Sequence, residues 1–143
     1  MLTVQTILAQ KGREIFHVSP DATVLDALRE MAARSCGALL VLDRGRPVGM
    51  LSERDYARKV VLMGRVSSNT LVREIMNEEV VCVPIGMGVD KCMALMTEYR
   101  SRHLLVRDGD VMVGVISIGD VVKALMDEQQ STIDQLQHYI TGY

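Results

Sequence analysis

Two short stretches of the chain place a serine and an aspartate three residues apart, each directly after an apolar run. They are Ser52 and Asp55 in VGMLSERD, and Ser117 and Asp120 in VGVISIGD. Ser-x-x-Asp at a helix start is typical of a capping box, in which both side chains satisfy free backbone N–H groups. The same helix start presents N–H groups and the positive end of the helix dipole, which favour a bound phosphate. The pattern therefore fits either a cap alone or a cap that also contacts a ligand.

The two stretches belong to a longer internal repeat. Residues 15–55, shifted by 65 positions, fall on 80–120 without a gap. Upstream, VQTIL at 4–8 matches VREIM at 72–76 after a further three-residue offset. Because two repeats are too few for a solenoid and neither could bury much surface alone, we expect the two copies to stack on each other.

Each copy has the pattern of a β-α-β-β-α unit. In the first copy, EIFHVS predicts a short strand, and the apolar spacing from Val24 to Met31 predicts one buried face of a helix that stops near Gly37. ALLVLD is a continuous apolar run and predicts a buried strand, VGML predicts a second strand, and a helix follows over 53–63. In the second copy the expected elements are strands at 80–83, 103–107 and 111–116, a helix at 88–99 and a helix from 118 onward.

The composition excludes several classes of protein. Apolar residues make up 48% of the 143 residues and aromatic residues only 3%, so the core must be aliphatic. A net charge of −2 argues against a nucleic-acid binder held by phosphate contacts, and the scarcity of aromatic residues argues against base stacking. Three scattered cysteines without CxxC indicate free thiols in a reducing compartment. With no signal peptide and no apolar run of membrane-spanning length, we expect a cytoplasmic protein without a membrane partner.

The last helix is expected to run beyond the repeat. An apolar stripe continues at three-to-four spacing and consists of Val122, Leu125, Gln129, Ile133, Leu136 and Ile140. The stripe can pack back on its own chain or contact another one. We favour another copy of the chain, because a twofold homodimer is the commonest closed arrangement.

The doubled β-α-β-β-α unit, with each copy ending in Gly-x-x-Ser-x-x-Asp, resembles the tandem CBS-domain module, also called a Bateman module. The resemblance spans about residues 1–126. It implies an α/β (α+β) fold of two repeats related by pseudo-twofold symmetry. The expected divisions are repeat 1 at 1–63, a linker at 64–71, repeat 2 at 72–126 and a helical tail at 127–143.

The same resemblance implies a regulatory function. Modules of this family bind AMP, ADP, ATP, NAD or S-adenosylmethionine in clefts between the two repeats, without chemical turnover, and are often dimers. The chain leaves no room for an attached catalytic domain, so it looks like a stand-alone CBS pair. We expect a sensor that is bound to an adenine nucleotide and has no catalytic cofactor.

The resemblance assigns roles to the repeated serines and aspartates. Asp55 and Asp120 are expected to accept hydrogen bonds from ribose hydroxyls, as an acidic residue does in dinucleotide-binding folds. Ser52 and Ser117 are expected to donate to phosphate.

Basic residues differ between the copies. Arg102 and His103 precede the middle strand of the second copy, where the family often has phosphate contacts, and we favour that role over surface charge. Arg54 and Arg58 follow the first motif and fit either a ligand contact or a solvated helix face. Lys11 lies in the unmatched insertion and is assigned to the cleft of the first copy.

The family builds its adenine slot from the segment before the first strand and from the strands. These positions are Met76, Val80, Val81 and Ile116 in the second copy, and Ile15, Phe16, Ala38 and Leu51 in the first. Each could equally be an ordinary core residue.

An enzyme and a ligand-free scaffold are the two other classes of function to compare with a sensor. The histidines His17, His103 and His138 fit no metal-ligand or nucleophile pattern, and neither a Walker sequence nor GxGxxG occurs. GMLSERD also lacks the second glycine of a hydrolase nucleophile elbow, so we expect neither catalytic residues nor a metal site. A ligand-free scaffold that dimerises through its helices and tail is the alternative, although the presence of Asp in both motifs argues against it.

Overall fold

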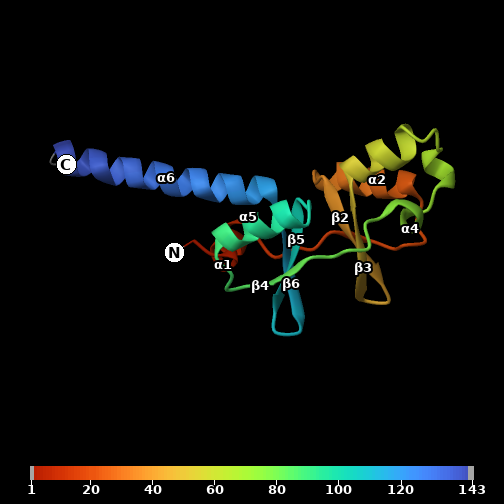
Figure 1. Ribbon diagram of the computed structural model, residues 1–143, viewed down its shortest axis with the longest axis horizontal. Helices are drawn as coiled ribbons and strands as arrows, with labels where there is room; N and C mark the ends of the chain where they lie inside the picture. Colours follow the sequence, from red (N-terminus) through yellow and green to blue (C-terminus); the bar gives the residue numbers. More distant parts are fainter. Residues whose placement is uncertain (1, 142–143) are drawn as a thin grey trace. The chain divides into compact units, whose positions relative to one another are not determined.

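The computed structural model describes residues 2–141 and divides the chain into two compact units. The central unit is Ile15–Val80, and the terminal unit combines the segment up to Glu14 with the chain from Val81 onward (Figure 1). Each unit holds a three-stranded mixed sheet and helices, which confirms the predicted mixed α/β fold class. The described helices include none that is long and apolar enough to cross a membrane.

The central unit follows the order predicted for the first copy. Its elements are β1 (His17–Val18), α2 (Val24–Arg34), β2 (Ala38–Asp43), β3 (Arg46–Ser52), α3 (Glu53–Tyr56), a π-helical turn (Ala57–Val61), a 3-10 turn (Ser67–Asn69) and α4 (Val72–Ile75). Strand β2 pairs in parallel with β1 and antiparallel with β3. The helix predicted over 53–63 is therefore one α-helical turn followed by a π-helical turn.

The terminal unit repeats this order. Its elements are α1 (Val4–Lys11), β4 (Cys82–Pro84), α5 (Val89–Glu98), β5 (His103–Asp108), β6 (Val111–Ser117) and α6 (Ile118–Thr141). Strand β5 is parallel to β4 and antiparallel to β6, so the two sheets share one topology. Helix α6 continues far past the repeat, as the apolar stripe predicted.

Short-range signals explain why the matched helices begin and end where they do. The Thr23 side chain caps α2 by accepting a hydrogen bond from the Asp26 backbone N–H at 3.1 Å. Ser35 ends α2 in the left-handed conformation with φ 53°, and Arg100 takes φ 52° after α5. Helix α2 therefore ends at Ser35, two residues before Gly37, near which the sequence predicted its end.

The core of each unit includes a helix that belongs to the other repeat. From α1, the buried residues Val4, Ile7 and Leu8 join the core formed by the strands and helices of the second copy. From α4, Val72 and Ile75 join the core of the first copy. The short helix at the start of each repeat thus packs in the compact unit that holds the strands of the other repeat, and we call this arrangement the exchange of helices. The sequence repeats and the compact units therefore divide the chain differently.

Matched backbone hydrogen bonds hold these two helices in place. In the terminal unit they are Val4 N–H to Met87 O (2.9 Å) and Gln5 N–H to Ile85 O (3.0 Å); in the central unit they are Val72 N–H to Ala22 O (2.9 Å) and Arg73 N–H to Pro20 O (3.0 Å). Each pair satisfies N–H groups of the first helical turn, which have no partner within the helix. The exchange of helices therefore follows the same geometry in both units.

Glycines in β3 and β6 make room for the exchanged helices. A Cβ on Gly114 would lie 2.8 Å from Leu8 Cδ2, and a Cβ on Gly49 would lie 2.7 Å from Met76 Sδ. Leu8 and Met76 occupy matching positions of the repeated segments 4–8 and 72–76. At Gly49 the Asn77 carbonyl oxygen is also only 3.0 Å away, and it accepts a hydrogen bond from the Met50 N–H at 2.9 Å.

We predict that Gly49→Ala lowers the free energy of unfolding by about 1–3 kcal/mol, because overpacking displaces neighbours in a dense core. Gly114→Ala should cost less, since the atoms that crowd it belong to the Leu8 side chain, whereas a backbone carbonyl also crowds Gly49. Urea denaturation of both variants tests this. Gly86→Ala is the control, because a Cβ there meets nothing within 4 Å. Equal stability of Gly49→Ala and Gly86→Ala would contradict the prediction.

Candidate ligand site

Both Ser-x-x-Asp motifs form reciprocal helix caps. In the central unit the Asp55 N–H donates to Ser52 Oγ at 3.3 Å, and Asp55 Oδ2 accepts from the Ser52 N–H and hydroxyl, each at 3.0 Å. In the terminal unit the Asp120 N–H donates to Ser117 Oγ at 3.1 Å, and the Ser117 N–H donates to Asp120 Oδ2 at 2.8 Å. The capping-box prediction is therefore confirmed in both copies, and any ligand contact would be added to it.

Arg102 and His103 lie beside the motif of their own copy. His103 pairs with Ser117 across the antiparallel β5–β6 ladder, and the Arg102 carbonyl oxygen accepts a hydrogen bond from the Ile118 N–H at 2.9 Å. In the central unit the equivalent places hold Ala38, which pairs with Ser52, and Gly37, whose carbonyl accepts from the Glu53 N–H at 3.0 Å. The basic pair thus distinguishes the second motif from the first.

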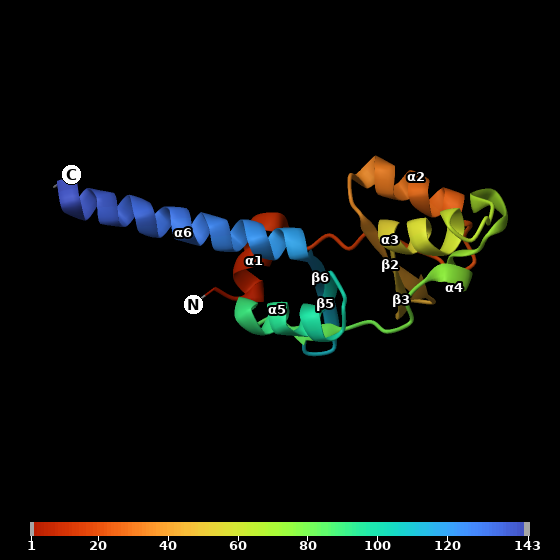
Figure 2. The same ribbon diagram turned by 45° about the horizontal axis from the view of Figure 1, so that its top comes forward.

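Lys11 is the residue whose position differs most from the sequence prediction. Its ammonium donates to Asp120 Oδ2 at 2.6 Å and to the Val115 carbonyl oxygen at 2.7 Å. The sequence assigned Lys11 to the cleft of the first copy, whereas the structure places it on the motif of the second. The reason is the exchange of helices, because α1 packs beside the first turns of α6 (Figure 2).

The surroundings of Asp120 favour its charged form. Burial by itself raises the pKa of this carboxyl group, but the hydrogen bond from Lys11, the hydrogen bonds from Ser117 and the Lys11 charge together lower the pKa below its usual range. Its side chain is 23% exposed and that of Lys11 is 37% exposed, so water still reaches both groups. The pair presents a fixed carboxylate and a cation at one point of the surface.

In the central unit a different lysine takes this place. Lys59, one helical turn after Asp55, has its Nζ 3.7 Å from Asp55 Oδ1 and donates to the Ile75 carbonyl oxygen at 3.0 Å. The i, i+4 spacing of Asp55 and Lys59 could have predicted this pair. Of the two arginines predicted nearby, Arg54 is half-buried and Arg58 is exposed.

The exchange of helices also changes which unit holds two residues of the predicted adenine slot. Met76 and Val80, which the sequence places in the slot of the second copy, both belong to the central unit, and Met76 packs against Gly49 of the first copy. Val81 belongs to the terminal unit, where its carbonyl oxygen accepts from the Leu105 N–H at 2.9 Å.

The other predicted slot residues stay with their own copies. Ile116 and Leu51 lie fully within the two hydrophobic cores, which is the packing role left open by the sequence. Phe16 packs against the central core with the Arg34 guanidinium 5.3 Å from its ring centre. Ile15 and Ala38 are half-buried.

A small hollow adjoins the carboxylate of the second motif. It measures about 150 Å³ and is lined by Ile7, Gln10, Lys11, Asp120, Lys123 and Ala124. This is below the roughly 300–1,000 Å³ of pockets that enclose a whole ligand. A ligand bound to Asp120 would therefore place only one group, such as a sugar or phosphate, in this hollow. Gln10 and Lys123 line this hollow but are not among the ligand-binding residues predicted from the sequence.

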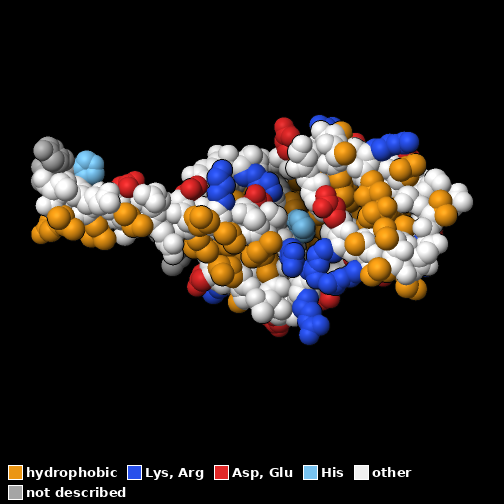
Figure 3. All heavy atoms as spheres, turned by 90° about the horizontal axis from the view of Figure 1, so that it is seen from above, with side chains coloured by type: hydrophobic (Ala, Val, Ile, Leu, Met, Phe, Trp, Pro, Cys, Tyr) orange, Lys and Arg blue, Asp and Glu red, His pale blue; other side chains and the backbone are white. Residues whose placement is uncertain are grey.

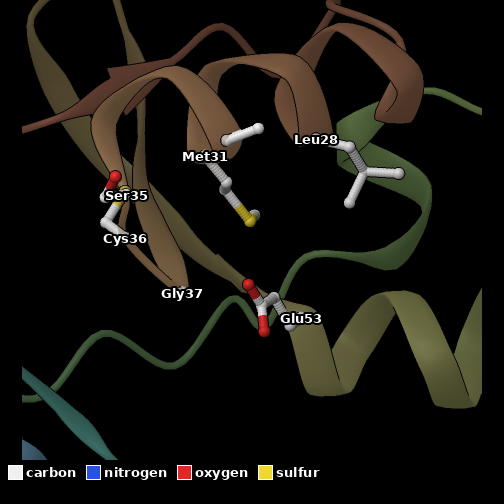
Figure 4. Close-up of a pocket in the computed structure, with 7 residues that line it drawn as sticks. Leu28, Met31, Ser35, Cys36, Gly37 and Glu53 are labelled. Atoms are coloured by element: carbon white, nitrogen blue, oxygen red, sulfur yellow. The ribbon is translucent and has the colours of Figure 1, made fainter.

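A larger hollow of about 440 Å³ lies in the central unit, between the end of α2 and the start of α3. Figure 4 shows Met31 and Leu28 of α2 facing it, with Glu53 of α3 on another side. Glu53 is the one charged residue among those that line it, and the residues predicted to bind ligand do not line it. This hollow therefore does not suit a phosphate.

The Lys11–Asp120 pair predicts how acid affects stability. Because the folded pKa of Asp120 is lowered, its charge stabilises the fold above the unfolded pKa of about 3.9, and this contribution is lost as pH falls through the folded pKa. Lys11→Gln removes the main favourable partner, so acid unfolding should begin at higher pH than in the unsubstituted protein. Circular dichroism between pH 2 and pH 6, with Lys91→Gln as the control for lost charge, measures this. Identical acid transitions in the two variants would refute it.

Comparisons with known proteins agree with this architecture. The family model described as "CBS domain" matches residues 11–62 and 72–127. The structure of a protein with CBS domains from Burkholderia ambifaria MC40-6 is 48% identical, with a TM-score of 0.85, and the match covers 89% of this chain and 96% of that one. The structure of a hexameric CBS-CP12 protein from bloom-forming cyanobacteria is 29% identical, with a TM-score of 0.77, and covers 85% and 70%.

A curated relative extends the match to almost the whole sequence. The CBS domain-containing protein CBSX3, mitochondrial, of Arabidopsis thaliana is 36% identical over 149 residues, which cover 98% of this chain and 72% of that protein. Proteins of this kind are typically regulatory modules. The two matched copies, the shared topology and the paired Ser-x-x-Asp caps together establish that this chain belongs to the CBS-domain family, with two CBS domains in tandem.

Proposed function

We propose that this chain is a regulatory module that binds an adenosine-containing ligand, such as AMP, ADP, ATP or NAD, without converting it. The observation that supports the proposal best is the carboxylate of Asp120. Its hydrogen bonds from the Ser117 N–H and from Lys11 both fall on Oδ2, so Oδ1 takes neither of them. A half-buried carboxylate whose second oxygen takes neither of these bonds suits the hydroxyl donors of a ribose.

Cations around Asp120 support the phosphate part of the proposal. Lys11 and Lys123 line the small hollow, and Arg102 and His103 lie at the neighbouring strand end. The N–H groups at the start of α6 add a partial positive charge. In this proposal Ser117 and the basic residues contact phosphate while Asp120 binds ribose, and Ser52 and Asp55 serve the central unit in the same way.

A homodimer is the second part of the proposal, and it also serves the scaffold alternative. Ile133, Leu136 and Ile140 are 47%, 56% and 81% exposed, although they share one face of α6. Apolar side chains line one edge of this helix (orange, at the left of Figure 3). An apolar face of this length favours contact with another chain, and a second copy offers the same face.

We predict that Asp120→Ala lowers the affinity for AMP at least tenfold, because a lost charged hydrogen-bond partner costs roughly 1.5–3 kcal/mol. Titration calorimetry on ligand-stripped protein measures this. Asp127→Ala, which removes an exposed carboxylate of the same helix, is the matched control. Chromatography of the nucleotide after incubation should show it unchanged.

The proposed class of ligand, an adenosine-containing molecule, is tested separately by thermal unfolding. A ligand that binds only the folded state at a hundredfold excess over Kd adds about 2.7 kcal/mol of stability. The melting temperature should therefore rise with AMP, ATP or NAD and much less with a pyrimidine nucleotide. If neither a purine nucleotide nor S-adenosylmethionine raises it, the sensor proposal is wrong and the scaffold alternative gains.

For the dimer, we predict that truncation after Met126 and Leu136→Asp both weaken self-association, since the substitution places an unpaired charge in an apolar contact. Ser131→Asp is the matched control, because position 131 lies on the opposite face of α6. Sedimentation over a range of concentrations reads out the association. A full-length chain that remains monomeric at high micromolar concentration would rule out the dimer, and a dimer that tolerates both changes would place the interface elsewhere.

A further inference from the structure

The contact between Lys11 and Asp120 joins the proposed ligand carboxylate to the end of a helix. Lys11 is the last residue of α1, and Gly12, with φ 100°, ends the helix. Residues 12–14 then lead the chain out of the terminal unit, which ends on this side at Glu14. Lys11 therefore lies close in the chain to the point where the chain passes from the terminal unit to the central unit.

The two ends of α1 are held differently. The helix up to Leu8 is fixed by the buried side chains of Val4, Ile7 and Leu8 and by the backbone bonds from Val4 and Gln5. At its last residue, the polar side-chain contacts are those of Lys11 with Asp120 and Val115. After Leu8, the C-terminal end of α1 is held by the bond from the Gly12 N–H to the Leu8 carbonyl oxygen and by the side-chain contacts of Lys11.

A ribose that binds with one hydroxyl on each carboxylate oxygen would compete with Lys11 for Oδ2 of Asp120. A carboxylate oxygen offers about two acceptor sites, and Oδ2 already accepts from the Ser117 N–H at 2.8 Å and from Lys11 at 2.6 Å. Adjacent ribose hydroxyls that engage both carboxylate oxygens need one of these donors to leave. The Ser117 N–H belongs to the helix cap and is fixed by the backbone, whereas the ammonium of Lys11 stands at the end of a flexible four-carbon side chain.

The central unit lacks an equivalent arrangement. Lys11 lies in the insertion of the first copy, which the second copy does not match. The lysine near Asp55 is Lys59, which comes from the same helix start, lies 3.7 Å from the other oxygen, Oδ1, and bonds to the Ile75 carbonyl oxygen. Competition for Oδ2 by a lysine of the exchanged helix is therefore a property of the terminal unit.

From these contacts we propose that Lys11 senses occupancy of the terminal site. Without ligand it holds Asp120 and fixes the end of α1; when a ribose diol binds Asp120, Lys11 leaves the carboxylate and releases that end. The sensor rests on the proposed function, since it needs a ligand with a diol at Asp120. A phosphate on the ligand offers the displaced ammonium a new acceptor, whereas adenosine leaves it to water.

Lysine acetylation followed by mass spectrometry tests the displacement in the full chain. Adenosine is the probe, and calorimetry on the same sample establishes that it binds. Acetylation of Lys11 should rise several-fold at saturating adenosine, whereas that of Lys91, an exposed lysine of α5, stays constant. Asp120→Asn should raise the reactivity of Lys11 without any ligand, because the amide does not attract the ammonium by charge.

A matched pair of variants tests the competition itself. Lys11→Gln should bind adenosine up to about fivefold more tightly than the unsubstituted protein, since an exposed ion pair contributes at most roughly 1 kcal/mol. Lys91→Gln should leave that affinity unchanged. Binding of adenosine without a change at Lys11, or weaker binding by Lys11→Gln, would overturn the sensor alone. Absence of binding by both adenosine and AMP would overturn the proposed function and the sensor with it.

Discussion

Both units depend on a side chain that packs directly against the bare backbone of a glycine in the third strand. Leu8 on Gly114 and Met76 on Gly49 bring a short helix so close to the strand that a Cβ would overlap with it. Since the helix and the strand of each contact come from different repeats, this steric requirement makes each core a product of both copies. Neither repeat taken alone contains all the residues that fill one hydrophobic core.

The same exchange makes two similar motifs electrostatically different. Asp120 meets a lysine from α1, a helix of the other repeat, whereas Asp55 meets a lysine from its own helix start. The terminal site also has Arg102 and His103 where the central unit has Gly37 and Ala38. The two domains therefore differ in charge although their sequences match, and the terminal motif carries the denser positive charge beside its carboxylate.

The helix cap and the proposed ligand contact both involve the side chains of Ser-x-x-Asp. The cap occupies the backbone N–H groups of the serine and the aspartate, and it directs the carboxylate to the helix start. It also fixes one oxygen in place, which lowers the conformational entropy that a ligand would otherwise have to remove. Capping and the proposed binding are thus compatible roles.

The sequence by itself determined the repeat, the order of strands and helices, the capping boxes and the length of α6. These follow from local rules: apolar periodicity, the Ser-x-x-Asp spacing and the match of residues 15–55 with 80–120. Helix α1 and the partners of Lys11, Met76 and Val80 were decided only by the tertiary structure. Their contacts join residues separated by long stretches of chain, such as Lys11 and Asp120, and local patterns carry no information on which repeat a short helix will pack against.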